Sequence, residues 1–451
     1  MGTEFSQEEL ERALDERRFG DLRAMISDSE SADVAESIGA LDPEKRTVVY
    51  RVLKRDLATE VFEHLDPEAQ EELIKGLGRE HVASILNDMS PDDRTSLLEE
   101  LPVAATKQVL AMLTPDERRV ANQLLGYPED SIGRMMTPDF IGLRSGWTVR
   151  EALEHIRLNG EDSETLNVLP VVDDRGVLID DLRVRQLLLA DPESRVETLL
   201  DGSFIALKAT DDQEQAVLVF KEYDRVAFPV TDSRGAMLGI VTVDDVLDVA
   251  EEEATEDIQK IGGSAALERP FMQIGFIDLV RKRAGWLVLL FVAQLLSLNV
   301  IQLFDEKLAK YTVLMFFIPL IISSGGNSGS QASTLVVRAM ALEEVRLGDW
   351  IRVLRREVAF GVSVGLVLGM IGFARIGLGS FPGEWFWLAL AVSVSVICVV
   401  LWGVILGSML PFIMRALGVD PASSSTPFVA TVVDVTGLLL YFAVAIAIIG
   451  I

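Results

Sequence analysis

The chain has 451 residues, 49% of them apolar and 24% charged, and a formal net charge of −28. Most of the charge lies in residues 1–270, which carry 59 acidic and 29 basic side chains, whereas residues 271–451 carry 10 and 12. Such an acidic region repels nucleic acid and anionic lipid headgroups. We therefore expect it to have no nucleic-acid partner and to attract cations. Cys398 is the single cysteine, which excludes an intramolecular disulfide and a thiolate metal cluster.

A short pattern recurs every 24 residues within residues 1–130, beginning at Leu41, Leu65, Met89 and Leu113. In each copy Asp, Ser or Thr precedes a proline, and an acidic residue follows it. These residue types favour the first turn of a helix, because they cap free N–H groups and complement the helix dipole. The repeat therefore predicts an all-α superhelix of stacked short helices over residues 1–130.

Residues 131–243 show a different pattern, with β-branched runs at 167–172 and 226–230. Acidic turn residues and glycine follow each run, and then a helical stretch. This alternation predicts strand, turn, strand and helix units in tandem, and therefore an α/β section. An acidic linker helix is expected at residues 244–262, where like charges crowd at spacings of one, three and four. Its crowded acids are Glu251, Glu252, Glu253, Glu256 and Asp257.

Residues 263–451 contain five apolar segments long enough to cross a hydrocarbon core of about 30 Å as helices. They are residues 284–304, 311–337, 358–378, 385–414 and 427–451. The third carries Arg375 near one end, from which a long side chain can reach the headgroups. We therefore predict an α-helical membrane domain with five transmembrane helices.

Basic side chains are distributed unequally between the loops of this domain. Nine lie before the first span, between the second and third spans, or between the fourth and fifth, whereas Lys307, Lys310 and Arg375 lie on the other side. The positive-inside rule then places the N-terminus in the cytoplasm and the C-terminus outside the cell. The predicted protein is a multi-pass protein of the cell membrane whose acidic region samples the cytosol.

Asp434 is the one charged residue in segment 427–451. A carboxylate in hydrocarbon costs several kcal/mol, so such a residue usually faces a partner, a cavity or an ion path. No basic residue inside another span offers it a partner. Pro427, Ala430 and Gly437 share its face of the helix by the spacing of three and four. We therefore expect Asp434 to handle cations.

The sequence does not predict an enzyme. His64, His81 and His155 lie in helical stretches of the soluble section, with no matching cysteine or nucleophile elbow. Surface or packing roles explain them more simply, so no catalytic residue is assigned.

Two sets of residues resemble known families. Residues 169–173, 228–232 and 238–245 resemble a pair of CBS (cystathionine-β-synthase type) motifs. Pro319 through Gln331 and Pro427 through Leu438 resemble the second and fifth membrane helices of the MgtE family of magnesium channels. Together with the superhelix and the acidic linker, the resemblance to that family covers nearly the whole chain. It implies a multidomain fold: N domain 1–130, tandem CBS domains 131–243, a linker called the plug at 244–262, and a transmembrane domain 263–451.

This sequence departs from the family pattern at three places. Ser330 and Thr426 stand where asparagine is usual. Leu178 to Leu182 of the first CBS copy stand where Gly and Ser or Thr are usual. These differences concern ion hydration and the nucleotide cleft, and they leave the central carboxylate in place.

The resemblance implies a homodimer with a pore on its twofold axis, in which Asp434 and the Ala430 carbonyl contact Mg²⁺ that keeps its waters. Asn327, Pro427 and Gly437 are pore-lining candidates, although the small residues of 325–329 fit close helix packing equally well. Mg²⁺ is also expected to bind acids of the cytosolic region and close the pore. The resemblance selects Glu60, Asp92, Asp212, Glu214, Asp224, Asp245, Asp248, Glu253, Glu256 and Asp257. It leaves open ATP as a ligand of the CBS domains.

The prediction is therefore a Mg²⁺-selective channel that mediates uptake down the electrochemical gradient. Two alternatives stay open. In a coupled secondary Mg²⁺ transporter, the same Asp434 would alternate between Mg²⁺ and a counter-ion. In a CBS nucleotide sensor on a membrane scaffold, the chain would transport nothing.

Overall fold

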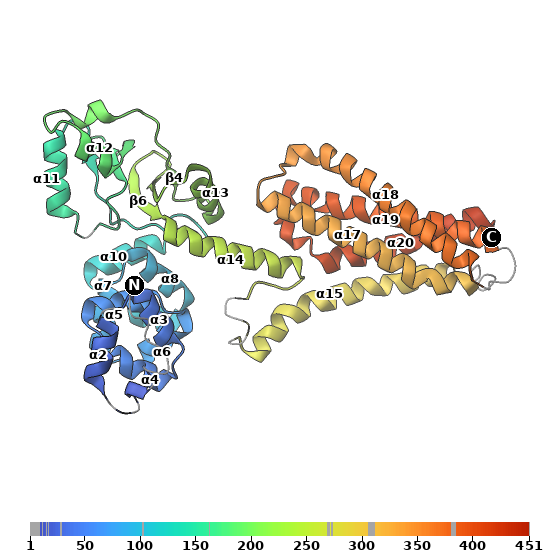
Figure 1. The fold of residues 1–451 in the computed structure, drawn as a ribbon, viewed down its shortest axis with the longest axis horizontal. Coiled ribbons are helices and arrows are strands. Elements are labelled where there is room, and N and C mark those ends of the chain that lie inside the picture. The colour runs from blue at the N-terminus through green and yellow to red at the C-terminus, as the bar shows by residue number, and fades with distance from the viewer. Residues whose placement is uncertain are drawn as a thin grey trace. The chain divides into compact units, whose positions relative to one another are not determined.

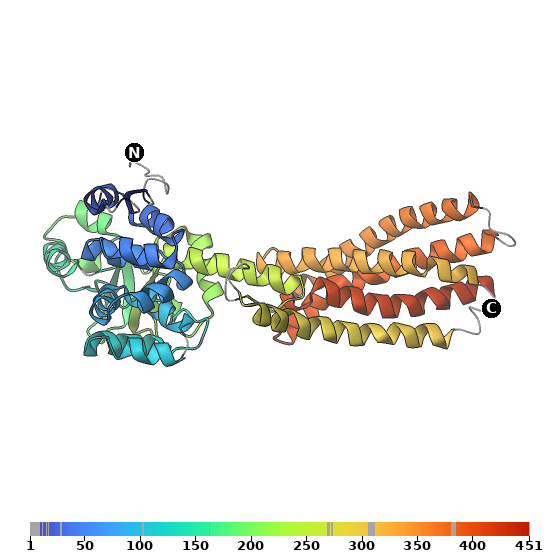
Figure 2. The ribbon, with the colours of Figure 1, turned by 90° about the horizontal axis from the view of Figure 1, so that it is seen from below.

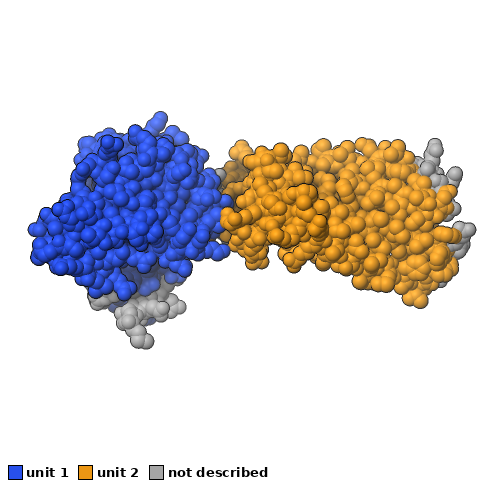
Figure 3. Space-filling model, turned by 90° about the horizontal axis from the view of Figure 1, so that it is seen from above, with its two compact units in different colours: residues 1–250 blue, residues 251–451 orange. Residues whose placement is uncertain are grey.

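The structure is a computed structural model that describes residues 10, 12–14, 16, 18–27, 29–101, 103–161, 163–267, 271, 274–304, 312–379 and 385–450. Lys307 and Lys310, which entered the predicted topology, lie outside these residues. The chain forms two compact units, residues 1–250 and 251–451 (Figure 3). Each unit is considered by itself below.

Unit 1 begins with a series of short helices (Figure 1). They are α2 (Phe19–Ser27), α3 (Ser31–Gly39), α4 (Pro43–Tyr50), α5 (Arg55–Glu63), α6 (Pro67–Gly76), α7 (Arg79–Asp88), α8 (Pro91–Glu100), α9 (Val103–Leu110) and α10 (Pro115–Leu124). The predicted helix starts are confirmed, because α4, α6, α8 and α10 each begin at the repeated proline. Asp66, Ser90 and Thr114 cap their helices by accepting a backbone N–H, whereas Asp42 makes no such bond.

The repeat contains a second helix that its sequence pattern does not reveal. Helices α3, α5, α7 and α9 begin at residues 31, 55, 79 and 103, which again are 24 apart. The residues before the first three of them, Glu30, Lys54 and Gly78, make no side-chain cap bond. These helices therefore form because their apolar faces pack against the proline-initiated helices.

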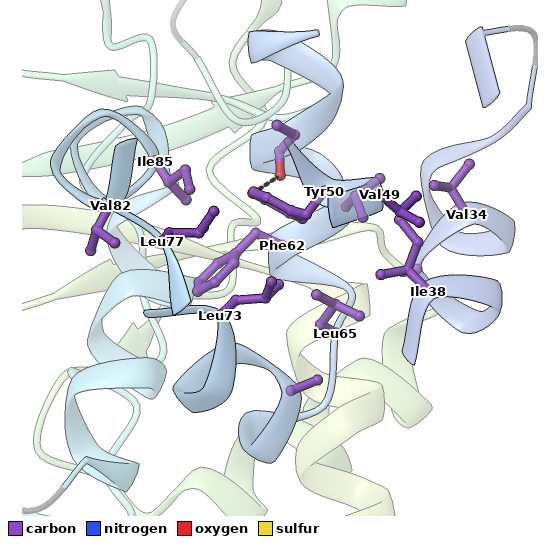
Figure 4. Packing of buried hydrophobic residues seen from close by; sticks show 14 of the residues in the cluster. Val34, Ile38, Val49, Tyr50, Phe62, Leu65, Leu73, Leu77, Val82 and Ile85 are labelled. Carbon is purple, nitrogen blue, oxygen red and sulfur yellow. Dashed lines mark hydrogen bonds between the residues drawn. The ribbon is translucent and has the colours of Figure 1, made fainter. Parts of the chain in front are cut away.

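One polar position ties each helix pair together. Arg46, Gln70 and Arg94, again 24 residues apart, are buried and donate to the carbonyl oxygens of Ile38, Phe62 and Leu86. Each bond reaches back eight residues and satisfies a carbonyl near the end of the preceding helix. The apolar side chains of these helices pack into one core, among them Phe62, Leu73 and Leu77 (Figure 4).

Two small sheets follow in unit 1. In the first, β1 (Leu143–Arg144) pairs in parallel with β2 (Leu169–Val172), which pairs antiparallel with β3 (Leu178–Leu182). In the second, β4 (Leu207–Lys208), β5 (Ala227–Thr231) and β6 (Met237–Thr242) repeat that order. Helices α11 (Val149–Asn159), α12 (Val184–Leu189), α13 (Gln213–Tyr223) and α14 (Val243–Ile261) accompany them, with the 3₁₀ turn η1 (Val196–Leu199). The predicted tandem α/β units are confirmed.

Unit 2 contains five helices long and apolar enough to cross a membrane among the described residues, as predicted. They are α15 (Phe276–Leu303), α17 (Ile318–Ala341) preceded by the 3₁₀ turn η2 (Thr312–Phe317), α18 (Trp350–Gly377) preceded by η3 (Leu347–Asp349), α19 (Trp385–Ala416), and α20 (Thr426–Ile449) preceded by η4 (Pro421–Ser423). The long helices run side by side (Figure 2). Helix α18 starts before the apolar segment expected from residue 358, because its arginine-bearing first turns are helical although they are not apolar.

Helices α17 and α19 pack through glycine. A Cβ added at Gly403 would lie 2.4 Å from the carbonyl oxygen of Gly325, and one at Gly407 would lie 2.1 Å from that of Gly329. Such backbone approach is possible only without side chains. It fixes one face of α17 against α19, and the opposite face carries the site described next.

Candidate functional site

A cleft of about 530 Å³ lies between α17 and α20 in unit 2. Helix α17 contributes the polar side chains of Ser323, Asn327, Ser330 and Gln331. Helix α20 contributes Thr426, Pro427, Ala430 and Asp434. Among the described residues that line the cleft, Asp434 is the one that carries a charge. The cleft thus combines polar side chains of α17 with a single carboxylate of α20.

Asp434 is held from two sides. Its Oδ2 accepts a hydrogen bond of 3.4 Å from the Gln294 side-chain amide on α15. Its Oδ1 lies over Gly326, where an added Cβ would sit 3.4 Å away. One carboxylate oxygen is therefore occupied by an uncharged donor, and the other lies beside a residue that has no side chain.

The predicted pore residues divide into two groups. Asn327, Pro427, Ala430 and Asp434 line the cleft together. Gly437 does not, and that expectation is corrected: an added Cβ there would meet Val399 of α19 at 3.1 Å, so Gly437 serves helix packing. The small residues of 325–329 therefore have two roles. Gly325 and Gly329 pack against α19, whereas Gly326 and Asn327 line the cleft.

Pro427 stands in the first turn of α20, which begins at Thr426. The N–H groups of a first turn have no partner within the helix, so a proline there frees no carbonyl inside it. Pro427 therefore interrupts no hydrogen bond of the helix, and Ala430 lies in uninterrupted helix.

Ser330 and Thr426, the two membrane positions that depart from the family pattern, contact each other. Ser330 Oγ donates to the Thr426 carbonyl oxygen at 3.2 Å, and the hydroxyl of Thr426 lies 3.3 Å from that of Thr334. Short hydroxyl side chains thus link α17 to the start of α20 at one end of the cleft.

The last turns of α14 belong to unit 2 and are fixed by an ion-pair network. Lys260 Nζ lies 2.7 Å from Glu256 and 2.8 Å from Asp420, at the start of η4. Burial and the charge of Asp420 raise the pKa of Asp257. After α14, Gly263 adopts φ +77°, and an added Cβ there would meet Trp286 at 3.0 Å and Pro427 at 3.2 Å. The chain that leaves the linker helix therefore contacts a residue of the cleft.

A second group of functional candidates lies in unit 1, and we call it the acidic cluster. Its members interact electrostatically and come from α5, α8, the loop before β2, and the start of α14. They are Glu63, Asp92, Asp93, Glu164, Asp244, Asp245 and Asp248. The structure thus brings together Asp92, Asp245 and Asp248, which the resemblance selected, and adds Glu63, Asp93, Glu164 and Asp244.

Burial dominates the electrostatics of this cluster. Asp92 is 7% exposed, and no described donor reaches its Oδ1. Burial and the charge of Asp245 raise the pKa of Asp92 well above its usual range. Burial likewise raises the pKa of Glu63 to about 7 and that of Asp245 to about 7, with neighbouring acids adding to the effect. Acidic side chains are therefore concentrated here in a place that disfavours their charged forms.

The other selected acids are placed apart from this cluster or at its edge. Glu60 precedes Glu63 by one turn of α5 and contributes to the rise in its pKa. Asp212 caps the N-terminus of α13 and Asp224 ends that helix, so about 18 Å of helix separates them. Glu214 lies in the first turn of α13, and Glu253 lies in α14. Among the described residues, no three His, Cys, Asp or Glu side chains converge closely enough to hold a metal ion directly.

The first α/β unit uses its unusual acids structurally. Asp180 is 1% exposed and accepts backbone N–H groups from Asp181, Asp201 and Gly202. Asp181 forms an ion pair with Arg225, which also lies over the ring of Phe228. In the second unit, the hydroxyl of Thr242 donates instead to Asp245 at 2.5 Å. The acids of the two units therefore make different contacts.

Comparison with known proteins covers both units. Residues 318–444 match the family described as a divalent cation transporter, MgtE. Residues 29–130 match the MgtE intracellular N domain, and residues 132–193 and 196–252 match CBS domains.

Similar proteins include the magnesium transporter MgtE of Thermus thermophilus, 39% identical over 328 residues, which are 73% of this chain and 72% of that protein. The magnesium transporter MgtE of Bacillus subtilis is 32% identical over 72% of this chain and 71% of its own length. The solved cytosolic domain of the Mg²⁺ channel MgtE in complex with ATP is 34% identical, with a TM-score of 0.52 over 54% of this chain and 100% of that one. The solved soluble part of a magnesium transporter is 26% identical, with the same TM-score over 55% of this chain and 100% of that one. This chain belongs to the MgtE family of magnesium transporters.

Proposed function

We propose that the chain is a Mg²⁺-selective channel that mediates uptake down the electrochemical gradient and closes when cytosolic Mg²⁺ binds its acidic groups. The observation that carries the proposal is the cleft with its one carboxylate, Asp434. Mg²⁺ gives up its waters reluctantly, so a path for it needs room for the hydrated ion more than a cage of ligands. Six waters occupy roughly 180 Å³ at about 30 Å³ each, and the cleft of about 530 Å³ accommodates them.

The polar face of α17 supports a dimeric pore. Ser323, Asn327, Gln331 and Thr334 recur at spacings of four, four and three along one face and are exposed in the single chain. Lipid cannot satisfy such a stripe inside a membrane span, so the stripe requires water or another protein surface. A second copy that faces the same cleft would enclose it, and two Asp434 carboxylates would balance one Mg²⁺. The Ala430 carbonyl would complete the contact, because a helical carbonyl keeps one free lone pair.

The acidic cluster supports closure by Mg²⁺. Asp92 and Asp245 are buried acids whose charged forms repel each other, so a divalent cation that binds there stabilises the arrangement in which α8 and α14 lie together. Because the side chains do not converge on a direct metal site, the bound ion would keep waters between itself and some carboxylates. The acids Glu253, Glu256 and Asp257 of the linker form the second part of this sensor. The ATP complex of the related cytosolic domain supports ATP as a ligand of the CBS domains.

The orientation follows from the same proposal. The acidic unit faces the cytosol and the C-terminus lies outside the plasma membrane, as the basic loops predict.

Mg²⁺ flux into proteoliposomes tests the central step. Asp434→Asn keeps the size of the side chain and removes the charge, and we expect it to lower the flux about 100-fold or more. The matched control is Asp349→Asn, because Asp349 is also an acid of unit 2 but pairs with Arg352 away from the cleft. Wild-type flux through the Asp434→Asn protein would contradict the proposal and favour a sensor on a membrane scaffold. Single-channel current without a coupling ion separates a channel from a coupled transporter.

A further inference from the structure

Gln294 is an amide in the middle of α15, between the apolar residues 287–293 and 295–296. The buried residues of this helix are Leu290, Ser297 and Val300, and Gln294 falls on the same stripe, four residues after Leu290 and three before Ser297. Helix α15 packs against α20, so this stripe faces the helix that carries Asp434. Gln294 is half-buried, and an amide in a membrane span is unfavourable unless it is hydrogen-bonded.

The partner of this amide is the cleft carboxylate. Gln294 Nε2 donates to Asp434 Oδ2 at 3.4 Å. Asp434 Oδ1 instead lies over Gly326 and next to the cleft wall. The two oxygens of one carboxylate therefore have different surroundings: one is bound by a neutral donor behind the cleft, and the other is left for the ion.

We propose that Gln294 is a positioning residue that fixes the orientation of Asp434 and so sets the affinity of the cleft for Mg²⁺. A neutral amide can do this without cancelling the charge, whereas lysine or arginine at the same place would neutralise the carboxylate and remove its attraction for a cation. Pre-organisation of this kind matters because a free carboxylate loses rotamer freedom when the ion binds. The inference rests on the proposed function, since it assumes that Asp434 contacts the permeating ion.

The test compares two glutamines of the same helix. Gln294→Met keeps the length of the side chain and removes the donor, and Gln302→Met makes the same change at an exposed position near the end of α15. We expect Gln294→Met to raise the half-saturating Mg²⁺ concentration for flux about tenfold, with a smaller change in maximal rate, because a lost hydrogen bond to a charged group is worth about 1.5 kcal/mol or more. Gln302→Met should leave both values unchanged.

Gln294→Asn provides a second variant if the first does not fold. It keeps the amide but is one methylene shorter, so at this helix distance it should fail to reach Asp434 and shift the half-saturating concentration in the same direction. A purely structural role would lower thermal stability and leave that concentration as in the wild type. A half-saturating concentration within twofold of the wild-type value in either folded variant would overturn the inference.

Asp434→Asn separates this outcome from failure of the proposed function. If Asp434→Asn abolishes flux while Gln294→Met behaves as wild type, the inference on Gln294 fails alone. If Asp434→Asn conducts normally, the proposed function fails and the inference on Gln294 fails with it.

Discussion

Under the proposed function, the cleft and the acidic cluster would recognise a divalent cation in two different ways. The cleft has one carboxylate among hydroxyls and amides, with an open face. The acidic cluster has seven carboxylates from four places in the chain, and Asp92 within it is nearly inaccessible. Conduction requires an ion to leave as readily as it enters, whereas a sensor gains from holding its ion. A site with few charges suits conduction, and a site with many charges suits a sensor.

A second carboxylate in the cleft would break this contrast and should lower the flux. Asn327 lines the cleft, and its amide lies 3.3 Å from Ser323 Oγ. Asn327→Asp adds a charge at nearly constant size, so the ion should bind more tightly, leave more slowly and pass at a flux lowered about tenfold or more. Proteoliposome flux measures this, and Asn327→Ser is the neutral control. An undiminished flux in Asn327→Asp would show that the single charge is not a requirement of the path.

Removal of one acid from the acidic cluster tests whether its many carboxylates are needed to bind Mg²⁺. Asp92→Asn relieves repulsion in the buried cluster, so hydrogen exchange of α8 should slow in the absence of Mg²⁺. The Mg²⁺ concentration that gives half of the Mg²⁺-induced protection should rise about tenfold, because one ligand is lost. Asp88→Asn is the control, since Asp88 on α7 already pairs with Arg55 at 2.7 Å. An unchanged Mg²⁺ response in Asp92→Asn would exclude Asp92 from the sensor.

Protons should partly replace the cation in the cluster. Glu63 and Asp245 have pKa values raised to about 7 in the folded chain, from ordinary values of 4.5 and 3.8. The folded state therefore binds more protons than the unfolded state between about pH 4 and 7, and the stabilisation is lost as pH rises through 7. Without Mg²⁺, the free energy of unfolding of unit 1 should be about 2 kcal/mol higher at pH 6 than at pH 8, with allowance for screening.

Hydrogen exchange of α8 in the full-length protein, corrected for intrinsic exchange rates, measures that difference. Glu63→Gln should reduce it, and saturating Mg²⁺ should reduce it as well. A free energy of unfolding that rises from pH 6 to pH 8 would contradict the raised pKa values of Glu63 and Asp245.

The smallest effect concerns the ion pairs of α14. Lys260 and Asp420 are partly exposed, so the pair should contribute about 0.5–1 kcal/mol to local stability. A double-mutant cycle with Lys260→Met and Asp420→Asn, read by hydrogen exchange of residues 251–261, measures the coupling. The exposed pair of Arg346 and Glu343 serves as the control and should show less. No coupling between Lys260 and Asp420 would mean that other contacts hold the end of the helix.

Local sequence signals predicted the proline-initiated helices of unit 1 but not their partners. Each signal at Pro67, Pro91 and Pro115 depends on a cap two or three residues long, which can be seen without the fold. The intervening helices have no such caps, and tertiary packing determines them. Periodicity at 24 residues held for both kinds of helix, but only one kind carried a recognisable motif.

The site shows the same division between local and distant information. Asp434 could be singled out because a lone charge in an apolar span is unusual. Gln294 could have been noticed as an amide within an apolar span. Its contact with Asp434 could not be predicted, because the two residues are 140 positions apart in the sequence. Likewise, nothing local distinguishes Gly326 from Gly325, although they face the cleft and α19 respectively. Asp420 could not be connected with Lys260, because their pairing depends on the loop between two membrane helices.

The glycine contacts between α17 and α19 set the position of one wall of the cleft by main-chain atoms alone. Side chains can change rotamer and so alter the spacing between elements, but a carbonyl against an α-carbon has no such freedom. The position of this wall should therefore respond little to temperature and to the thickness of the surrounding bilayer. Exchange of Asn327 or Ser330 can alter the chemistry of the cleft, but moving this wall would require α17 and α19 to be repacked against each other.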